Sequence, residues 1–315
     1  MGYNFNPLEL KGLATYSLAD RKSKVTREHF AKNWQKGNTF AGFLDTLPDV
    51  LAGRDIKAVI DAAAAAHKNQ KIILFGMGAH VIKVGLNPII IDLLKRKVLT
   101  GIAMNGAGII HDFELAFAGK TSEDVAAALG DGSFGMAKET CEHLGAAIRL
   151  AADENIGLGE AVGRYINQNG FPYADQSLLA AAERLKKPAT VHVAIGTDII
   201  HMHPSFDPEA AGKATHIDFR LFAAIVAELS QGVYFNIGSA VIMPEIFLKA
   251  VSLVRNLGHA VSDLTTVNMD FIRHYRPMTN VVNRPTADHG RGINLVGHHE
   301  ILLPLIAAGI LEKIE

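Results

Sequence analysis

The stretch that decides the fold is GIAMNGAGIIHDFE, residues Gly101–Glu114. Its apolar run, Ile102–Met104, is typical of a buried parallel strand. Small residues follow at once, and they let the backbone approach a ligand at the carboxyl end of the strand. These residues are Asn105, Gly106, Ala107 and Gly108. Asp112 then supplies a carboxylate in the first turn of a helix. This order predicts one unit of an α/β sheet with a ligand-facing turn.

A similar unit lies just upstream in KIILFGMGAHVIKVGLNP, residues Lys71–Pro88. Gly76, Gly78 and Gly85 have roughly the spacing of a dinucleotide-binding loop, without its strict G-x-G-x-x-G form. Two such turns after adjacent strands predict a nucleotide-type crevice. The predicted cofactor-binding residues of these two turns are Gly76, Gly78, Ala79, His80, Asn105, Gly106, Gly108 and Asp112.

Apolar, β-branched runs recur along the chain, with helical patterns between most of them. The runs cover residues 72–75, 100–104, 190–195, 233–237 and 264–267. This alternation predicts an α/β fold with a doubly wound, mainly parallel, Rossmann-like sheet. Residues 112–188 contain no good strand and are expected to form a helical insertion. Residues 1–50 are expected to form an N-terminal arm with helices, and residues 1–315 a single domain.

Predicted helices fill the intervals between the runs, and several have recognisable capping residues. They are residues 39–51, 55–68, 86–97, 122–129, 134–153, 158–168, 175–185, 217–229, 244–257 and 299–310. Two more glycine turns follow predicted strands, at Gly196 and at Gly238. A single turn of this kind is more simply a tight turn. Four at strand carboxyl ends favour a ligand crevice, which adds Gly238 and Ser239 to the predicted cofactor-binding residues.

The composition of the chain limits the classes of molecule that it is expected to bind. The 31 Lys and Arg nearly balance the 32 Asp and Glu, so no overall field favours nucleic acid or an anionic membrane. One cysteine, Cys141, excludes an intrachain disulfide and a multi-cysteine metal site. Apolar runs end well short of the ~18 residues of a membrane span. We therefore expect a cytoplasmic protein whose partner is a small molecule.

The segment Ile73–Gly119 resembles the cofactor-binding part of deoxyhypusine synthase in its order of strand, short turn, helix, second strand and glycine turn. The likeness continues more weakly through GTDIIH (Gly196–His201), VYFNIGSAVIMPEIFLKA (Val233–Ala250) and DLTTVNM (Asp263–Met269). It covers about two thirds of the chain. The resemblance implies an NAD-binding fold of the deoxyhypusine synthase-like superfamily. It also implies a homo-oligomer, a dimer or tetramer, with sites at the interface of paired subunits.

The chain differs from that family at the residues that carry the family's chemistry. The family's imine-forming lysine lies near the carboxyl end, whereas only Lys313 follows Lys249 here and it lies outside any matching motif. In the family's acidic turn only Asp112 matches cleanly. A histidine of the family is replaced by the run Met243–Glu245. The resemblance therefore implies a shared scaffold with different chemistry.

The richest polar cluster is GTDIIHMHPSFDPE, residues Gly196–Glu209. Asp198, His201 and His203 carry donor atoms that bind Zn²⁺, Mn²⁺ or Fe²⁺, with Asp207 and His216 nearby. No known metal-site spacing is reproduced. A metal centre, a metal-free polar binding surface and a structural role remain open, and no metal ligand is assigned.

A second cluster lies in Phe271–Glu300, which shows no clear periodicity and is expected to be a long loop. His289 beside Asp288 has the pattern of an oriented acid or base, and the arginines of the loop could clamp a carboxylate or phosphate. Substrate binding and subunit contact are equally compatible with this stretch.

Three functions follow from these patterns. The leading hypothesis is a protein that binds NAD or a related nucleotide and acts on a small amine or alcohol. Its catalytic residues would be Asp198, His201, His203 and His289. The first alternative is a metal-dependent hydrolase that uses Asp198, His201 and His203. The second is a non-catalytic nucleotide-binding protein.

Overall fold

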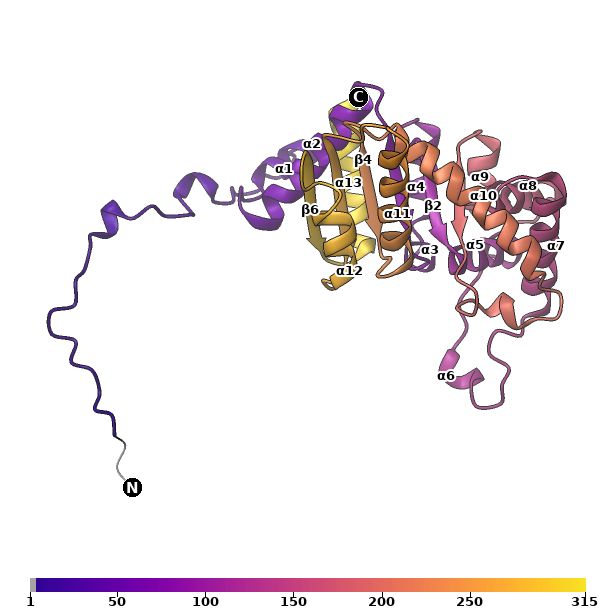
Figure 1. Cartoon of the computed structure of the whole chain (residues 1–315). Coiled ribbons are helices and arrows are strands. Elements are labelled where there is room, and N and C mark those ends of the chain that lie inside the picture. Colours follow the sequence, from indigo (N-terminus) through magenta and orange to yellow (C-terminus); the bar gives the residue numbers. More distant parts are fainter. Residues whose placement is uncertain (1–3) are drawn as a thin grey trace.

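A six-stranded parallel sheet forms the centre of the computed structural model, which describes residues 4–315 (Figure 1). The strands are β1 (Ile73–Met77), β2 (Gly101–Asn105), β3 (Ala189–His192), β4 (Val233–Ile237), β5 (Leu264–Asp270) and β6 (Gly290–Val296). Their order across the sheet is β3-β2-β1-β4-β5-β6, and every neighbouring pair is parallel. This is the strand order of dinucleotide-binding α/β proteins. The predicted doubly wound fold is confirmed.

Helices pack on both faces of the sheet (Figure 1). The α-helices are α1 (Phe40–Thr46), α2 (Leu51–Lys68), α3 (His80–Lys83), α4 (Asn87–Lys95), α5 (Gly106–Ala118), α6 (Val125–Ala128), α7 (Lys138–Glu154), α8 (Leu158–Asn169), α9 (Leu178–Arg184), α10 (Pro208–Ala227), α11 (Ile242–Asn256), α12 (Tyr275–Pro277) and α13 (His299–Ile314). Short 3-10 turns are η1 (Leu18–Asp20), η2 (Arg27–His29), η3 (Ala174–Gln176) and η4 (Ile199–Met202), and η5 (Met278–Asn283) is a π-helix. Helices α10 and α11 cover one face, and α2, α4 and α13 cover the other.

The central strands β1 and β4 are nearly continuous apolar runs because both of their faces are buried. In β1, the side chains of Ile73, Phe75 and Met77 enter one core, and Leu74 enters the other. Strand β4 alternates in the same way and places Tyr234 in the second core. Sequence signals for these central strands are therefore strong.

Between β2 and β3 the chain runs through α5, α6, α7, α8, η3 and α9, as the predicted helical insertion requires. Capping residues define several starts. The Asn105 side chain accepts a hydrogen bond from the Gly108 amide at 3.2 Å, and Asp207 accepts one from Ala210 at 2.9 Å. Because Pro208 follows this cap, α10 begins well before the predicted start at Ile217.

The long loop predicted over Phe271–Glu300 is wrong over most of its length, because α12 and η5 occupy residues 275–283 and a strand follows them. Residues 290–296 form β6, which pairs with β5 along its whole length. In β6, which has β5 as its one neighbour in the sheet, only Ile293 and Leu295 are buried. A strand with two buried apolar residues among glycine and polar residues gives too weak a period to recognise in the sequence.

The N-terminal arm extends away from the sheet (Figure 1). Residues 4–28 are all exposed, and their hydrogen bonds stay within the arm. Contact with the body begins where the His29 carbonyl accepts a hydrogen bond from Asp49 and Lys32 donates one to Thr46. Between residue 4 and the start of α1, the arm contains only the short turns η1 and η2. Among residues 4–315, no helix is both long and apolar enough to cross a bilayer.

Candidate functional site at the carboxyl edge of the sheet

The topological switch point lies between β1 and β4, because the chain builds the sheet outward in opposite directions from these two strands. Open α/β sheets bind ligands at the carboxyl ends of strands at such a point. Here the turn after β1 meets the turn after β4. A Cβ atom on Gly78 would lie 2.2 Å from the Gly238 carbonyl oxygen, so the two backbones touch. Gly238 itself has a φ of +64°, which favours glycine.

Imidazole and aromatic rings surround these turns. His80 begins α3, and its ring centroid lies 5.4 Å from that of His299 at the start of α13. Phe271 follows β5 directly, and its ring centroid lies 6.0 Å from that of His80. Burial, reinforced by His299, lowers the pKa of His80. His80 is half-buried at the switch point, and its imidazole therefore favours the neutral form.

Two buried polar atoms near these turns lack hydrogen-bond partners among the described residues. They are Nδ1 of His299 and Oδ1 of Asn236. The His299 Nε2 bonds to the Met269 carbonyl at 3.1 Å, so Nε2 carries the proton and Nδ1 is a free acceptor. Asn236 donates to the carbonyl of Ser239 at 2.9 Å. Buried acceptors without partners indicate unused hydrogen-bonding capacity next to the switch point.

Ser239 and Asn105 lie at this edge, but their side chains already cap helices. The Ser239 hydroxyl accepts a hydrogen bond from the Met243 amide at 3.1 Å at the start of α11. Asn105 caps α5. Ala79 lies between Gly78 and His80 in the turn after β1. These residues shape the edge, and His80 is the predicted member with a free polar side chain.

Two predicted cofactor-binding glycines serve packing instead. Gly76 lies inside β1, where a Cβ would come within 2.2 Å of the Tyr234 hydroxyl. A Cβ on Gly108 would lie 2.6 Å from the Met104 sulfur. Both glycines make room for side chains of the core. Their spacing resembled a ligand loop because close packing and ligand approach require the same residue type.

Asp112 is fully buried and faces α9 rather than the edge of the sheet. Its carboxylate accepts hydrogen bonds from the Ser177 hydroxyl at 2.6 Å and from the amides of Leu178 and Leu179 at 2.7 and 3.1 Å. Asn87 donates a fourth. With all its acceptors occupied, Asp112 holds α9 in place and is removed from the candidate site.

Asp198 does lie at the carboxyl edge, in the loop after β3. A Cβ on Gly106 would lie 2.0 Å from its Oδ2 atom, so the glycine at the start of α5 makes room for this carboxylate. The residue is 8% exposed, and Oδ2 has no hydrogen-bond partner among the described residues. Burial raises the pKa of Asp198 to about 6. Asp198 is the strongest of the predicted catalytic residues.

His201 and His203 do not form a chelating pair with Asp198. The His201 Nδ1 atom accepts hydrogen bonds from the amides of Gly196 at 3.1 Å and Asp198 at 3.2 Å. The His203 Nδ1 atom lies 2.7 Å from the Ser205 hydroxyl. Within residues 4–315, no three His, Cys, Asp or Glu side chains converge as metal ligands. The two imidazoles brace their loop, and this geometry does not favour the metal-dependent hydrolase.

His289 lies at the opposite edge of the sheet, immediately before β6. Its carbonyl accepts a hydrogen bond from the Asp263 amide, which precedes β5. Because all six strands are parallel, this position is the full length of a strand away from the carboxyl edge. The prediction that His289 joins the catalytic residues is corrected accordingly. It followed from reading the strand β6 as part of a loop.

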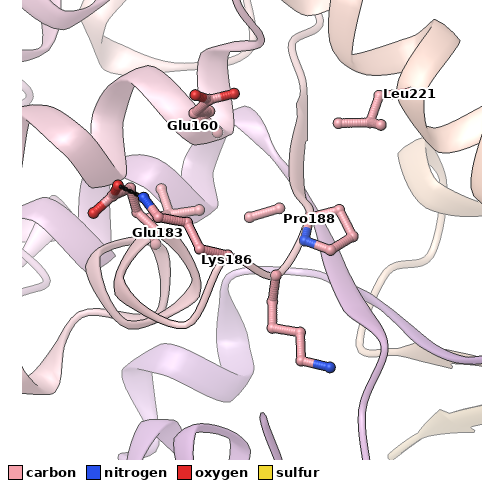
Figure 2. A pocket seen from close by; sticks show the side chains of 9 residues that line it. Glu160, Glu183, Lys186, Pro188 and Leu221 are labelled. Carbon is pink, nitrogen blue, oxygen red and sulfur yellow. Dashed lines mark hydrogen bonds and ion pairs between the residues drawn. The ribbon is translucent and has the colours of Figure 1, made fainter. Parts of the chain in front are cut away.

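A pocket of about 310 Å³ lies at the amino end of β3, also away from the carboxyl edge (Figure 2). Its charged residues include Glu183 and Lys186, which pair at 2.6 Å, and Lys186 is largely exposed. The side chains that Figure 2 labels do not converge on a common point in it. We therefore treat this hollow as a surface feature.

A second pocket, of about 200 Å³, lies at the carboxyl edge beside Asp198. Its lining includes polar residues that the sequence patterns did not assign, among them Lys83, His111 and Glu114. The available signal was helical spacing, because His111 and Glu114 lie three residues apart and share one face of α5. Asp112, between them in sequence, points into the core.

Known structures share this architecture. ArgZ, an arginine dihydrolase from the ornithine–ammonia cycle of cyanobacteria, superposes with a TM-score of 0.50 and 12% identity over 85% of this chain. Unliganded AgrE gives 0.51 and 12% over 84%. The chain has the same fold as these two proteins.

This chain spans about a third of the length of ArgZ and AgrE, 33% and 34% respectively. A proposed deoxyhypusine synthase from Entamoeba histolytica aligns over 89% of this chain and 96% of its own, with a TM-score of 0.48 and 12% identity. No protein-family model matches the chain, and no curated protein matches its sequence. What this chain shares with ArgZ and AgrE is the fold.

Proposed function

We propose that this protein binds NAD or a related nucleotide at the switch point between β1 and β4 and acts on a small amine or alcohol. The observation that carries the proposal is the strand order, β3-β2-β1-β4-β5-β6, with touching glycine turns at its switch point. The free acceptor of His299 and the half-buried ring of His80 supply polar contacts beside those turns.

The residues present fit a nucleotide only in part. The turn after β1 leads into the four-residue α3, without the glycine spacing of a pyrophosphate loop. Strand β2 ends in Asn105, where NAD-binding proteins place a carboxylate for the ribose. When bound, NAD would supply hydride acceptance, and the protein would orient the substrate and take its proton. A nucleotide-binding protein without catalysis remains the second candidate.

The test begins with the purified protein, denatured without added cofactor, and identifies released nucleotides by mass spectrometry. Added NAD⁺ should also raise the melting temperature, because a ligand at 100 times its Kd stabilises the native state by about 2.7 kcal/mol. His80→Ala should reduce that shift, and Lys186→Ala, at the opposite edge, should not. The proposal would be refuted if no nucleotide is released and if NAD⁺, NADH, ADP-ribose and ATP all leave the melting temperature unchanged.

We also propose that the chain assembles as a homo-oligomer through its N-terminal arm. Large apolar side chains of the arm are mostly exposed, namely Phe5, Leu8, Leu10, Leu13, Tyr16, Leu18, Val25, Phe30 and Trp34. Residues 4–39 carry seven Lys or Arg and three Asp or Glu, whereas residues 40–315 carry 24 and 29. A basic, apolar arm is complementary in charge to the acidic body of a second copy. The cytoplasmic location remains a prediction.

A further inference from the structure

The pocket beside Asp198 contains a hydrogen-bonded chain that the nucleotide proposal does not use. Lys83 enters the pocket from α3, His111 and Glu114 from α5, and Asp198 from the loop after β3. At about 200 Å³, the pocket is smaller than the ~300–1,000 Å³ typical of sites for drug-sized ligands. It therefore suits a small molecule.

Hydrogen bonds fix the tautomer of His111. The Thr121 hydroxyl donates its one hydrogen to the Glu114 carboxylate. The Nδ1 atom of His111 lies 2.7 Å from that hydroxyl oxygen, so Nδ1 must donate the proton between them. Glu114 is itself held by the Thr140 hydroxyl at 3.1 Å. The Nε2 atom of His111 is thereby left as a lone-pair acceptor, and it has no hydrogen-bond partner among residues 4–315.

The surroundings keep this imidazole neutral. Burial, helped by the Lys83 ammonium group, lowers the pKa of His111 to about 4. The carboxylates that face the pocket are Glu114, Glu123 and Asp198. Lys83 forms no ion pair with any described residue, so its charge remains available to a ligand.

We propose that His111 is the hydrogen-bond acceptor of this pocket, with Thr121 and Glu114 as positioning residues. The ligand is a small molecule that presents an O–H or N–H group to Nε2 and an anionic or carbonyl oxygen to Lys83. The neutral imidazole accepts a hydrogen bond from that group without taking the proton, and the Lys83 ammonium group pairs with the oxygen. The role of this contact in turnover rests on the proposed function; the tautomer and the open Nε2 atom do not.

The first experiment measures the tautomer in the full-length protein labelled with ¹⁵N-histidine, using long-range ¹H–¹⁵N correlations. His111→Asn identifies the signals, because an asparagine amide can still donate to Thr121 but has no Nε2 atom. We expect the proton on Nδ1 in the wild type and a shift toward Nε2–H in Thr121→Val. A wild-type His111 protonated on Nε2 would overturn the proposal.

The second experiment measures access to Nε2 with diethyl pyrocarbonate, which modifies neutral imidazole, followed by peptide mass spectrometry. We expect modification of His111 and slower modification in Thr121→Val. His143, which is hydrogen-bonded to Tyr165 outside the pocket, serves as the control and should be unaffected by that substitution. A protected His111 in the wild type would refute an acceptor that faces the pocket.

Lys83→Met tests the charge next to His111. Because a nearby cation disfavours imidazolium, its removal should raise the pKa of His111 in the same NMR titration. An unchanged pKa would show that Lys83 does not face the imidazole. These readouts need no nucleotide. Failure of nucleotide binding with the expected tautomer would therefore refute the proposed function alone, and bound nucleotide with the opposite tautomer would refute this inference alone.

Discussion

At the scale of single residues, buried carboxylates do much of the work of joining elements. Asp112 on α5 holds the start of α9 through hydrogen bonds to Ser177 and to two backbone amides. Asp218 on α10 accepts from the amides of Gly159 in α8 and Val191 in β3, at 2.9 and 2.8 Å. Neither faces the candidate site. The sequence predicts Asp112 as a cofactor-binding residue because burial and hydrogen bonding leave no mark in a sequence.

Asp112→Ala should destabilise the fold without removing a ligand contact. The substitution leaves the amides of Leu178 and Leu179 without acceptors, and losing a buried helix cap of this kind should lower the free energy of unfolding by about 3 kcal/mol. Asp92→Ala is the matched control. Its ion pair with Arg96 is half-exposed and screened by solvent, so little change in the free energy of unfolding is expected. Urea denaturation measures both. Equal effects would remove the structural role of Asp112.

Asp218→Asn should change how stability depends on pH. Burial raises the pKa of Asp218 to about 7 from 3.8. The native state therefore holds a proton that the unfolded state has lost between these values. The stabilisation is complete below the unfolded pKa and is lost as the pH rises through about 7. Asparagine does not titrate.

The melting temperature of Asp218→Asn, relative to wild type, should therefore rise steadily from about pH 4 to about pH 8. Asp112 and Asp198 also have raised pKa values, but they are present in both proteins and cancel in the difference. A difference in melting temperature that stays constant over this range would contradict the assignment. Calorimetry at several pH values measures it.

At the scale of elements, the sequence predicts five of the six strands and misses the edge strand β6. Strands β1, β2, β4 and β5 are buried on both faces, so continuous apolar runs reveal them. Edge strand β6 buries only Ile293 and Leu295, which hides it in an apparent loop and misplaces His289. The glycine pattern located the carboxyl-edge turns correctly. The pattern does not distinguish Gly78, which touches the facing turn, from Gly76, which accommodates Tyr234. Neither position has room for a Cβ atom, so both require glycine.

Gly76→Ala should therefore disturb packing between β1 and β4. Its Cβ would lie 2.2 Å from the Tyr234 hydroxyl and 2.8 Å from the ring carbon that bears it. Overpacking of this kind costs about 1–3 kcal/mol. The Tyr234 hydroxyl has no partner among the described residues, so Tyr234→Phe should be close to neutral and should recover part of that loss in the double variant.

Gly212→Ala is the control for this cycle. It lies in α10 with open space around its Cβ position, and alanine there should add about 0.5–1 kcal/mol of stability through helix propensity. Chemical denaturation of the four proteins of the cycle gives the coupling energy. Additive effects of Gly76→Ala and Tyr234→Phe would show that the two groups do not meet.

At the scale of the whole molecule, the arm and the body have opposite properties. Residues 4–28 bury little, yet they hold a row of large apolar side chains, whereas the body has a well-filled core on both faces of the sheet. A segment with few contacts contributes little to the stability of its own body. In the proposed homo-oligomer, the acidic body of a second copy of the chain covers this apolar arm.

Deletion of residues 1–28 should separate assembly from folding. The anchors of the remaining arm, at His29 and Lys32, stay in place, so the monomer should keep its circular dichroism spectrum. Light scattering after size-exclusion chromatography should show a larger assembly for the full chain and a smaller one for the truncated chain.

Charge reversal at Arg21, Lys22 and Lys24 to Glu should weaken the assembly, because it removes the charges that attract the acidic body. The association that is left should depend less on salt concentration. Asn replacement of Asp20 is the control and should leave the mass unchanged. If the full chain is monomeric, or if the truncated chain forms an assembly with the same number of copies, the arm does not join subunits.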